Sequence, residues 1–239
     1  MKNYLITLNQ DPTHFPNVNR ALISPDGLLA IGGDLSPLRI ISAYQQGIFP
    51  WYSANDPLLW WSPTNRATIR AGNVHISKSM RRLIKNNPYT ISVNKHFDKV
   101  IHACAKPRAA QNETWITKEI SQAYIRLHQL GWAHSIEVFY LGKLVGGLYG
   151  IVIGQIFCGE SMFSVMPNSS KLAFIALHQH FQSYNGQLID CQILTTHLES
   201  LGVKETPRAD FIKQLNLYNK KPLKSDCWQA QELILSTVF

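Results

Sequence analysis

The stretch SIEVFYLGKLVGGLYGIVIGQIFCGESMFS, residues 135–164, constrains the fold of this 239-residue chain most strongly. Its apolar residues recur with a period of two, which is typical of β-strands. Glycine-containing pairs at Gly142-Lys143 and Gly154-Gln155 predict two tight turns within it. The stretch therefore predicts a β-meander.

Segments on either side of the meander carry helical signals. Ser36, Pro37 and Gly47 are typical of the N-cap, the first position and the end of a short helix. Periodicity and caps predict further helices at residues 75–88, 117–131 and 169–186, a strand at 187–193, and short helical pieces after residue 195. This order predicts an α+β fold, with a small N-terminal α/β domain over residues 1–66 and a second domain over residues 67–239.

The composition is that of a soluble globular protein, with 45% hydrophobic and 16% charged residues. No window approaches the roughly 18 apolar residues that a membrane span needs. The start, MKNYLITLNQDP, lacks the pattern of a signal peptide. Four widely spaced cysteines argue against a zinc ribbon and are typical of reduced thiols. We therefore expect a cytoplasmic protein.

Basic residues are concentrated in one segment. Residues 66–108 hold ten Lys and Arg but a single acid, Asp98. A polyanionic partner would explain this concentration, and so would a solvated basic face. Four of these cations share one side of a predicted helix whose other side is apolar: Lys78, Arg81, Arg82 and Lys85. A stripe of one sign is typical of a surface that follows phosphates.

Aromatic side chains gather in GIFPWYSANDPLLWWSP, residues 47–63, which contains Trp51, Trp60 and Trp61. Two prolines within the segment argue against a regular helix or a central strand. The tryptophans then belong either to a core cluster pinned by a rigid loop or to the apolar wall of a pocket. The residues alone leave both explanations open.

Acidic side chains occur in two apolar segments. In LIDCQI, Asp190 and Gln192 would share one face of a strand. They would serve either as a general base with an amide partner or as a polar pair that caps neighbouring backbone. Glu160, in FCGESMFS, would either bind a cationic group or pair with a Lys or Arg of the chain. Cys191 is expected to be inert core.

The nine histidines show no spacing typical of metal ligands. His178 and His180 lie two apart on a predicted helix, and we expect both at the surface.

A set of short motifs resembles the leucyl/phenylalanyl-tRNA–protein transferases of bacteria, in the same order and at similar spacing from about Leu28 to Arg208. These motifs are GLLAIGGDLS, AYQQGIFPWY, LWWSP, HISKSMRR, TWIT, AYIRLHQLGWAHSIEV, LVGGLYG, FCGESMFS and LIDCQ. Asn65 departs from the pattern, because a proline is expected before Arg66, and this affects loop rigidity more than chemistry.

The resemblance implies an enzyme that takes Leu or Phe, and sometimes Met, from its aminoacyl-tRNA and joins it by a peptide bond to the N-terminal Arg or Lys of a protein. The product carries an N-terminal degradation signal. The resemblance also implies a C-terminal domain similar to the acetyltransferase (GNAT) superfamily, with a central antiparallel or mixed sheet. No metal or coenzyme is implied, and we expect a monomer.

The resemblance also implies catalytic roles. Asp190 would take up the proton of the attacking amine, or it would hold Gln192 while a ribose hydroxyl relays that proton. Gln192 would align the amine or the carbonyl group. Glu160 would pair with the cationic acceptor or position the terminal adenosine.

Binding roles follow in the same way. Met162 and Leu148 would line an apolar pocket for the donor side chain. Trp51, Trp115, Tyr44 and Tyr124 would stack or pack on the 3′ adenosine, while Trp60 and Trp61 hold the loop against the body. The four cations of residues 78–85 would contact phosphates of the acceptor stem.

Two other classes of protein remain as alternatives. A coenzyme-A acyltransferase would need a glycine-rich pyrophosphate loop that opens a helix, and SVMPNSSK, residues 164–171, is a poor substitute for one. An RNA-binding module without activity would explain the basic segment but not Asp190, Gln192 and Glu160.

Overall fold

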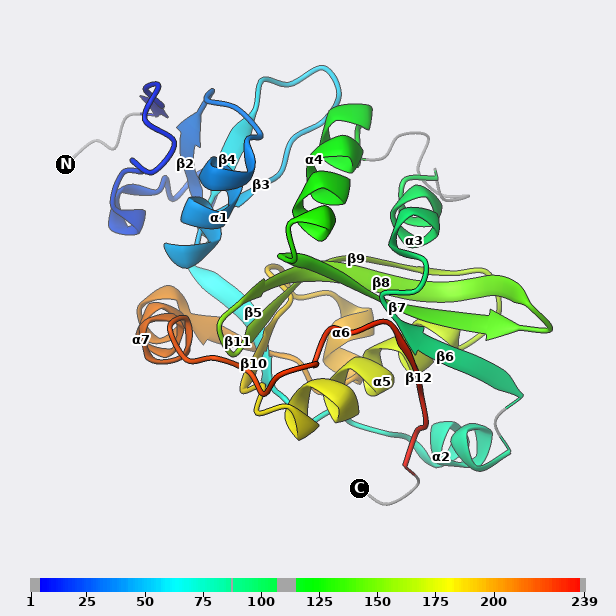
Figure 1. The fold of residues 1–239 in the computed structure, drawn as a ribbon. Coiled ribbons are helices and arrows are strands. Elements are labelled where there is room, and N and C mark those ends of the chain that lie inside the picture. The colour runs from blue at the N-terminus through cyan, green and yellow to red at the C-terminus, as the bar shows by residue number, and fades with distance from the viewer. Residues whose placement is uncertain (1–4, 87, 107–114, 237–239) are drawn as a thin grey trace.

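The computed structural model describes residues 5–86, 88–106 and 115–236 (Figure 1). A small mixed sheet lies at the N-terminal end in the order β1-β2-β4-β3, beside helix α1 (Pro37–Gln45). Its strands are β1 (Ile6–Thr7), β2 (Leu28–Ile31), β3 (Phe49–Pro50) and β4 (Leu59–Trp61), and a 3-10 turn, η1, covers Val18–Arg20. This unit is the small α/β part that the sequence predicts.

A larger sheet of eight strands forms the centre of the molecule, in the order β11-β5-β10-β9-β8-β7-β6-β12. Its pairings are antiparallel except for β10 with β9, so the sheet is mixed, as expected. The strands are β5 (Asn65–Arg70), β6 (Tyr89–Val93), β7 (Ala133–Tyr140), β8 (Lys143–Ile153), β9 (Ile156–Ser164), β10 (Leu188–Asp190), β11 (Lys204–Pro207) and β12 (Gln231–Leu233).

Helices cover both faces of this sheet. In Figure 1, α3 and α4 lie on the upper face, α5 and α6 lie below, α7 lies near β11, and α2 lies beyond the lower end of β6. Their bounds are α2 (Lys78–Lys85), α3 (Phe97–Cys104), α4 (Lys118–Gln129), α5 (Ser169–Ser183), α6 (Thr196–Ser200) and α7 (Arg208–Tyr218). The α+β class is therefore confirmed.

The predicted meander is confirmed as β7, β8 and β9. Its turns lie where glycines adopt positive φ, at Gly142 (73°) and Gly154 (58°). The predicted helices at α1, α2, α4 and α5 are confirmed too, and the Thr117 hydroxyl caps α4 by accepting a hydrogen bond from the Ile120 N–H. The short helical pieces predicted after residue 195 are α6 and α7. The sequence prediction missed β5, β6, α3, β11 and β12.

Two hydrophobic cores lie on the two faces of the large sheet. The upper core joins α1, α3 and α4 to the small sheet and contains Trp60, which is fully buried and donates its indole N–H to the Gly32 carbonyl (2.8 Å). The lower core surrounds α5. The expectation of surface positions for His178 and His180 was wrong, because α5 is buried around most of its circumference.

A β-bulge interrupts the pairing of β8 with β9. Tyr149 pairs with Ser161 and Gly150 pairs with Gly159, so Glu160 is the extra residue of β9. The bulge reverses the alternation of side chains along β9. Cys158 before it and Phe163 after it both belong to the upper core. A bulge re-aims the side chain at its site, here that of Glu160.

The sheet opens just beside the bulge. Strand β10 pairs with β9 only from Leu188 to Asp190, opposite Ile156 to Cys158. Beyond Asp190 the two strands are no longer paired, and a gap lies between β9 and the segment that leads to α6. This gap holds the cavity that is described below as the candidate active site.

The small sheet ends at Trp61 and the large sheet begins at Asn65, while one core spans both. The division into domains at residues 66 and 67 stays a prediction. Among the described residues, no helix has the length and apolar character that crossing a bilayer requires.

The bulge depends on a glycine. A Cβ at position 150 would lie 2.2 Å from the Cys158 carbonyl oxygen and 2.6 Å from the Phe157 ring. We expect Gly150→Ala to lower the free energy of unfolding by roughly 1–3 kcal/mol, because backbone and core must shift. Urea denaturation measures this.

The matched control is Gly159→Ala, on the other strand of the bulge. Its Cβ would find nothing closer than 3.8 Å, so the free energy of unfolding should change by less than about 1 kcal/mol. Equal losses in the two variants would contradict this account of the bulge.

Candidate active site

A cavity of about 610 Å³ occupies the gap in the large sheet. Its walls come from the small sheet, the segment before α4, β8, β9, α5 and the segment from Ile189 to Leu198. Six of the predicted site residues line it: Trp51, Trp115, Leu148, Glu160, Met162 and Gln192. The structure thus brings together residues that are up to 141 positions apart in the sequence.

Apolar side chains form most of the cavity wall below the sheet. Leu148 and Met162 face each other across the β8–β9 pair, and Phe157, Phe174 and Leu177 complete this part of the wall. Tyr149 lines the cavity with a buried hydroxyl that has no hydrogen-bond partner among the described residues. Such a wall suits an apolar ligand with few polar groups.

Glu160 stands at the polar end of the cavity. Its Oε1 accepts hydrogen bonds from the Tyr44 hydroxyl (2.6 Å) and the Gln192 Nε2 (3.2 Å), and its Oε2 accepts one from the Tyr124 hydroxyl (2.9 Å). Desolvation raises the pKa of Glu160 to about 7, against the lowering effect of the two tyrosine hydrogen bonds. A carboxyl group with a neutral pKa is suited to exchanging protons at physiological pH.

Tyr44 and Tyr124 lie behind Glu160 and do not line the cavity. Their side chains are fully buried, at 1% and 0% exposure, and their hydroxyl oxygens are 2.9 Å apart. The expectation that these rings stack on adenosine needs correction, because neither face is available to a ligand. Their hydroxyl groups serve Glu160 instead.

Asp190 is fully buried beneath the cavity. Both of its carboxylate oxygens accept hydrogen bonds from Arg66, one from Nε and one from Nη2, each 2.7 Å long. The Arg66 guanidinium lies between the rings of Phe49 and Phe211, at 4.6 and 4.7 Å from their centroids. The sequence prediction counted Arg66 among the basic surface residues, and this was wrong, because Asp190 neutralises it in the interior.

Gln192 reaches the cavity through a turn, which corrects the prediction of a strand over residues 187–193. Strand β10 ends at Asp190, and Gln192 adopts a φ of 58°, in the left-handed region that few non-glycine residues occupy. The Asp190 Oδ1 accepts the Gln192 backbone N–H (3.0 Å). The turn is fixed further where the Gln192 carbonyl accepts the Ala67 N–H (3.1 Å).

Two aromatic side chains stand at the mouth of the cavity. Trp51 is 43% exposed, and its ring meets that of Trp61 edge to face, at 5.7 Å between centroids. The Trp61 Nε1 donates to the Trp51 carbonyl (2.6 Å) and fixes the loop. Trp115 lines the same cavity from the segment before α4. The loop that holds Trp51 is thus pinned by Trp61, as expected.

The cysteines near the site are unsuited to nucleophilic chemistry. Burial raises the pKa of Cys158 and of Cys191, so both thiols stay protonated at neutral pH. Cys191 packs against the lower core, as expected, and also lines the cavity. Within the described residues, no group of three or more His, Cys, Asp and Glu is arranged to hold a metal ion.

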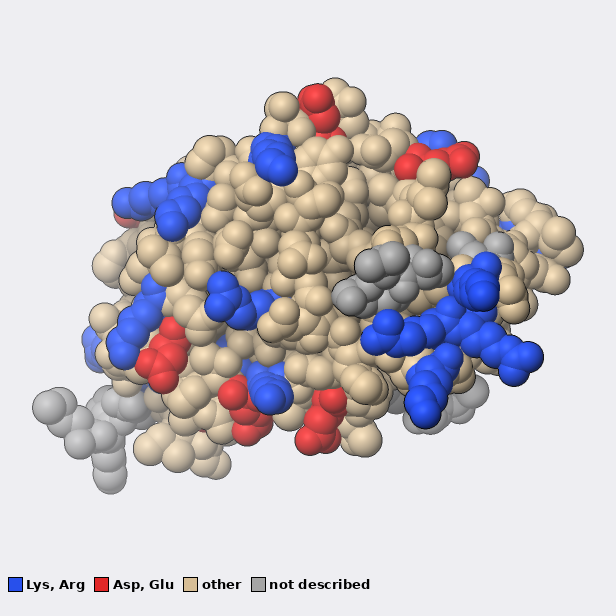
Figure 2. All heavy atoms as spheres, turned by 90° about the horizontal axis from the view of Figure 1, so that it is seen from below, with Lys and Arg blue, Asp and Glu red and all other residues tan. Residues whose placement is uncertain are grey.

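The predicted basic helix is α2. Met80 and Ile84 are buried in the lower core, while its four cations are exposed: Lys78, Arg81, Arg82 and Lys85. Figure 2 shows the molecule from below. Lys and Arg side chains gather at one end of the visible face, with no acidic side chain among them. We refer to the four cations as the basic stripe.

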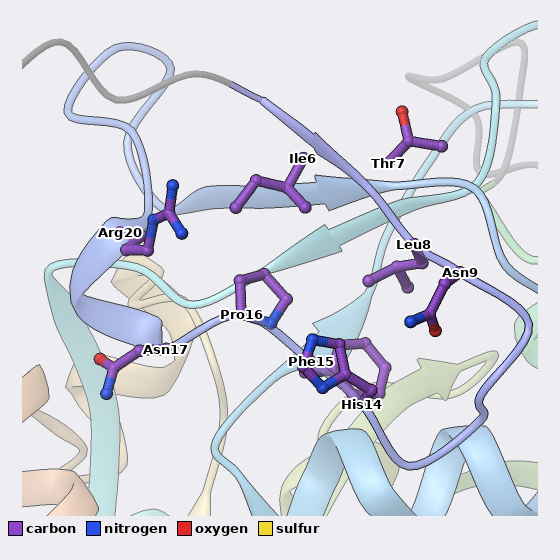
Figure 3. Close-up of a pocket in the computed structure, with 9 residues that line it drawn as sticks. All are labelled: Ile6, Thr7, Leu8, Asn9, His14, Phe15, Pro16, Asn17 and Arg20. Atoms are coloured by element: carbon purple, nitrogen blue, oxygen red, sulfur yellow. The ribbon is translucent and has the colours of Figure 1, made fainter.

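A second hollow, of about 360 Å³, lies between β1 and the segment around Phe15 (Figure 3). It contains none of the predicted site residues. Nine residues line it, among them the apolar Ile6, Leu8 and Phe15 and the polar His14 and Arg20.

Comparison with known proteins agrees with the sequence motifs. Residues 68–216 match the sequence model of the leucyl/phenylalanyl-tRNA protein transferase family, and residues 33–64 match its N-terminal domain. A leucyl/phenylalanyl-tRNA–protein transferase of Psychromonas ingrahamii is 56% identical over 98% of this chain and 99% of its own length. One from Pectobacterium atrosepticum is 50% identical over 96% of this chain and 97% of its own length.

Similarity to solved structures is low. The C-terminal domain of a protein from Agrobacterium fabrum aligns with a TM-score of 0.43 and 10% identity, over 80% of this chain and 73% of that domain. This similarity supports no conclusion about function.

The raised pKa of Glu160 links stability to pH. The carboxyl group ionises near 4.5 in the unfolded chain and near 7 in the folded one. Between these values the folded state binds more protons, so the free energy of unfolding falls as pH rises. We expect the wild type to lose roughly 2–3 kcal/mol relative to Glu160→Gln between pH 4.5 and 7.5.

Denaturant unfolding of both proteins at a series of pH values measures this difference, in which the contributions of other titrating groups cancel. Parallel stability curves for the two proteins would show that Glu160 ionises normally in the folded state.

Proposed function

Since this chain belongs to the leucyl/phenylalanyl-tRNA protein transferase family, we propose that it transfers Leu or Phe, and also Met, from aminoacyl-tRNA to the N-terminal Arg or Lys of acceptor proteins. The transfer of an aminoacyl group from tRNA to a protein is the activity named for its relatives. The finer substrate choices and the creation of an N-terminal degradation signal are part of the proposal. So are a monomeric state, a cytoplasmic location and a reaction without metal or coenzyme.

The observation that carries the proposal is the cavity in the split sheet. It joins an apolar wall to a polar end formed by Glu160 and Gln192, with two tryptophans at its mouth. An aminoacyl-adenosine has the matching parts: an apolar side chain, a reactive ester and a purine ring. We assign the donor side chain to the wall of Leu148 and Met162, and the adenosine to Trp51 and Trp115.

Asp190 acts through Gln192 in this proposal. Its two oxygens are engaged by Arg66, and its side chain does not reach the cavity. The same carboxylate accepts the Gln192 N–H and so holds the turn. We therefore assign Asp190 to positioning, and Gln192 to the alignment of the acceptor amine or the ester carbonyl. Both assignments are supported by the left-handed backbone at Gln192, because strained backbone of this kind is concentrated at functional sites.

The basic stripe on α2 would bind phosphates of the tRNA acceptor stem. Its four side chains are exposed, carry one sign of charge and project from one element. Contacts of this kind contribute affinity and orientation without reading sequence. Specificity for the amino acid then rests with the cavity, and affinity for tRNA rests largely with the stripe.

Transfer of labelled Leu from Leu-tRNA to a peptide that begins with Arg tests the function. We expect the wild type to transfer, and Leu148→Trp, which fills the apolar end of the cavity, to lose at least about a hundredfold in kcat/KM. A peptide with an acetylated N-terminus is the matched control substrate and should accept nothing. If the wild type binds Leu-tRNA but transfers nothing, the chain is a binding module instead.

Replacing Lys78, Arg81, Arg82 and Lys85 together by Gln tests the basic stripe. Each lost phosphate contact flattens the plot of log K against log salt by about 0.9, so we expect the slope for Leu-tRNA to become shallower by about 3 to 4. Reaction of a free aminoacyl-adenosine, which lacks the stem, should be unchanged. The control replaces four exposed lysines outside α2 by Gln: Lys143, Lys204, Lys213 and Lys220. An unchanged slope in the stripe variant, or an equal change in the control, would reject the stripe as the tRNA contact.

A further inference from the structure

We propose that Glu160, held by Tyr44 and Tyr124, accepts the proton that the attacking amine loses during transfer. This inference rests on the proposed transferase function and gives Glu160 a catalytic role in it. The two tyrosines are positioning residues, because they act on the substrate only through Glu160. The proposal rests on the geometry of these three side chains and on the other ionisable groups that face Glu160.

The three groups can accommodate both protonation states of Glu160. When Glu160 is ionised, both tyrosine hydroxyls donate to it, Tyr44 to Oε1 and Tyr124 to Oε2. When Oε1 carries a proton, that proton can be donated to the Tyr44 oxygen. Tyr44 then donates to Tyr124 across the 2.9 Å contact, and Tyr124 keeps its bond to Oε2. One hydroxyl rotation therefore closes a ring in which every proton is hydrogen-bonded.

This hydrogen-bonded ring lowers the free-energy cost of protonating Glu160. A buried polar group left without a partner costs about 1–3 kcal/mol, and a carboxyl group that changes its protonation state normally risks that cost. Here neither state leaves Tyr44, Tyr124 or Glu160 unpaired. The remaining bond to Glu160 comes from the Gln192 Nε2, which faces the cavity and links the ring to the place where the amine would lie.

The other ionisable groups that face Glu160 do not compete with it for protons near pH 7. Burial raises the pKa values of Tyr44, Tyr124 and Tyr149 well above that of a free tyrosine, and burial also raises the pKa of Cys158. These groups therefore keep their protons. Asp190 and Arg66 act on Glu160 in opposite directions and are bound to each other.

Asp190 is less suited to the same task. Its oxygens already accept two hydrogen bonds from Arg66 and one from the Gln192 backbone, and no part of the side chain is exposed. It is committed to Arg66, since the two side chains form a buried ion pair with two hydrogen bonds of 2.7 Å. Glu160 has no cationic partner among the described residues and opens onto the cavity.

The reaction balances with one proton held by Glu160. The acceptor attacks as a neutral amine, and a bond forms between its nitrogen and the ester carbon. One N–H proton passes to the Glu160 carboxylate. As the tetrahedral intermediate collapses, the ester C–O bond breaks and the proton is released to the departing 3′ oxygen of the ribose. The products are a peptide bond and a free ribose hydroxyl, and Glu160 is again ionised.

The test is the pH dependence of kcat, measured between pH 5.5 and 8.5 with saturating Leu-tRNA and acceptor peptide. Since Glu160 must be ionised, we expect the wild-type kcat to rise through a limb near pH 7. Tyr44→Phe and Tyr124→Phe each remove a hydrogen bond that stabilises the carboxylate, so each should move that limb upward by about one pH unit. Glu160→Gln should lower kcat about a hundredfold or more and abolish the limb.

Tyr140→Phe is the matched control. Tyr140 lies at the far end of β7 with its ring near Tyr89, and its variant should keep the wild-type profile. If Glu160→Gln fails to fold, Glu160→Asp replaces it, with a lower kcat and a retained limb as the expected result.

Three outcomes would overturn the proposal. A limb that stays in place in both tyrosine variants would show that the ring does not set the titration. A Glu160→Gln enzyme with nearly normal kcat and a raised KM would show that Glu160 binds a cationic group. A wild type that transfers nothing would reject the transferase function itself, whereas the first two outcomes leave that function intact.

Discussion

The ion pair between Arg66 and Asp190 is the interaction on which the site depends. It lies wholly inside the protein, where two unpaired charges could not persist. The guanidinium also donates to the Gly47 carbonyl (3.2 Å), just before β3, and lies between Phe49 and Phe211. One side chain therefore ties the tryptophan loop, α7 and the end of β10 to the turn that presents Gln192. The aromatic mouth and the polar end of the cavity are positioned by the same charge.

The cavity itself results from two interruptions of one sheet. The bulge at Glu160 turns an acid out of the regular alternation, and the early end of β10 removes the strand that would cover it. On its other side the segment after β10 stays bonded to β5, since the Cys191 N–H donates to the Ala67 carbonyl (2.8 Å). Glu160 is desolvated enough to hold a proton at neutral pH but still open to a ligand. A continuous sheet could not have combined these properties.

Local sequence signals predicted only part of the helices and strands, and few of the contacts between them. Caps, glycine turns and periodicity predicted the meander and α1, α2, α4 and α5, because these signals act over a few residues. The motifs predicted Glu160, Asp190 and Gln192 as site residues, and the structure brings the three residues close together. The partner of Asp190 was missed, since Arg66 is 124 positions away and looks like one more surface cation. The positions of Tyr44 and Tyr124 behind Glu160, and the left-handed turn at Gln192, depend likewise on tertiary packing that no local pattern records.

The most direct test of this account is the kcat of the double variant Arg66→Met/Asp190→Leu. Removing one charge alone should cost about 3–5 kcal/mol of stability, whereas replacing both by apolar side chains should restore most of it. We predict that the double variant folds and binds an aminoacyl-adenosine but transfers at least about a hundredfold more slowly, because the Gln192 N–H has lost its acceptor. Transfer at the wild-type rate by a stable double variant would contradict the claim that this ion pair holds the site in its working geometry.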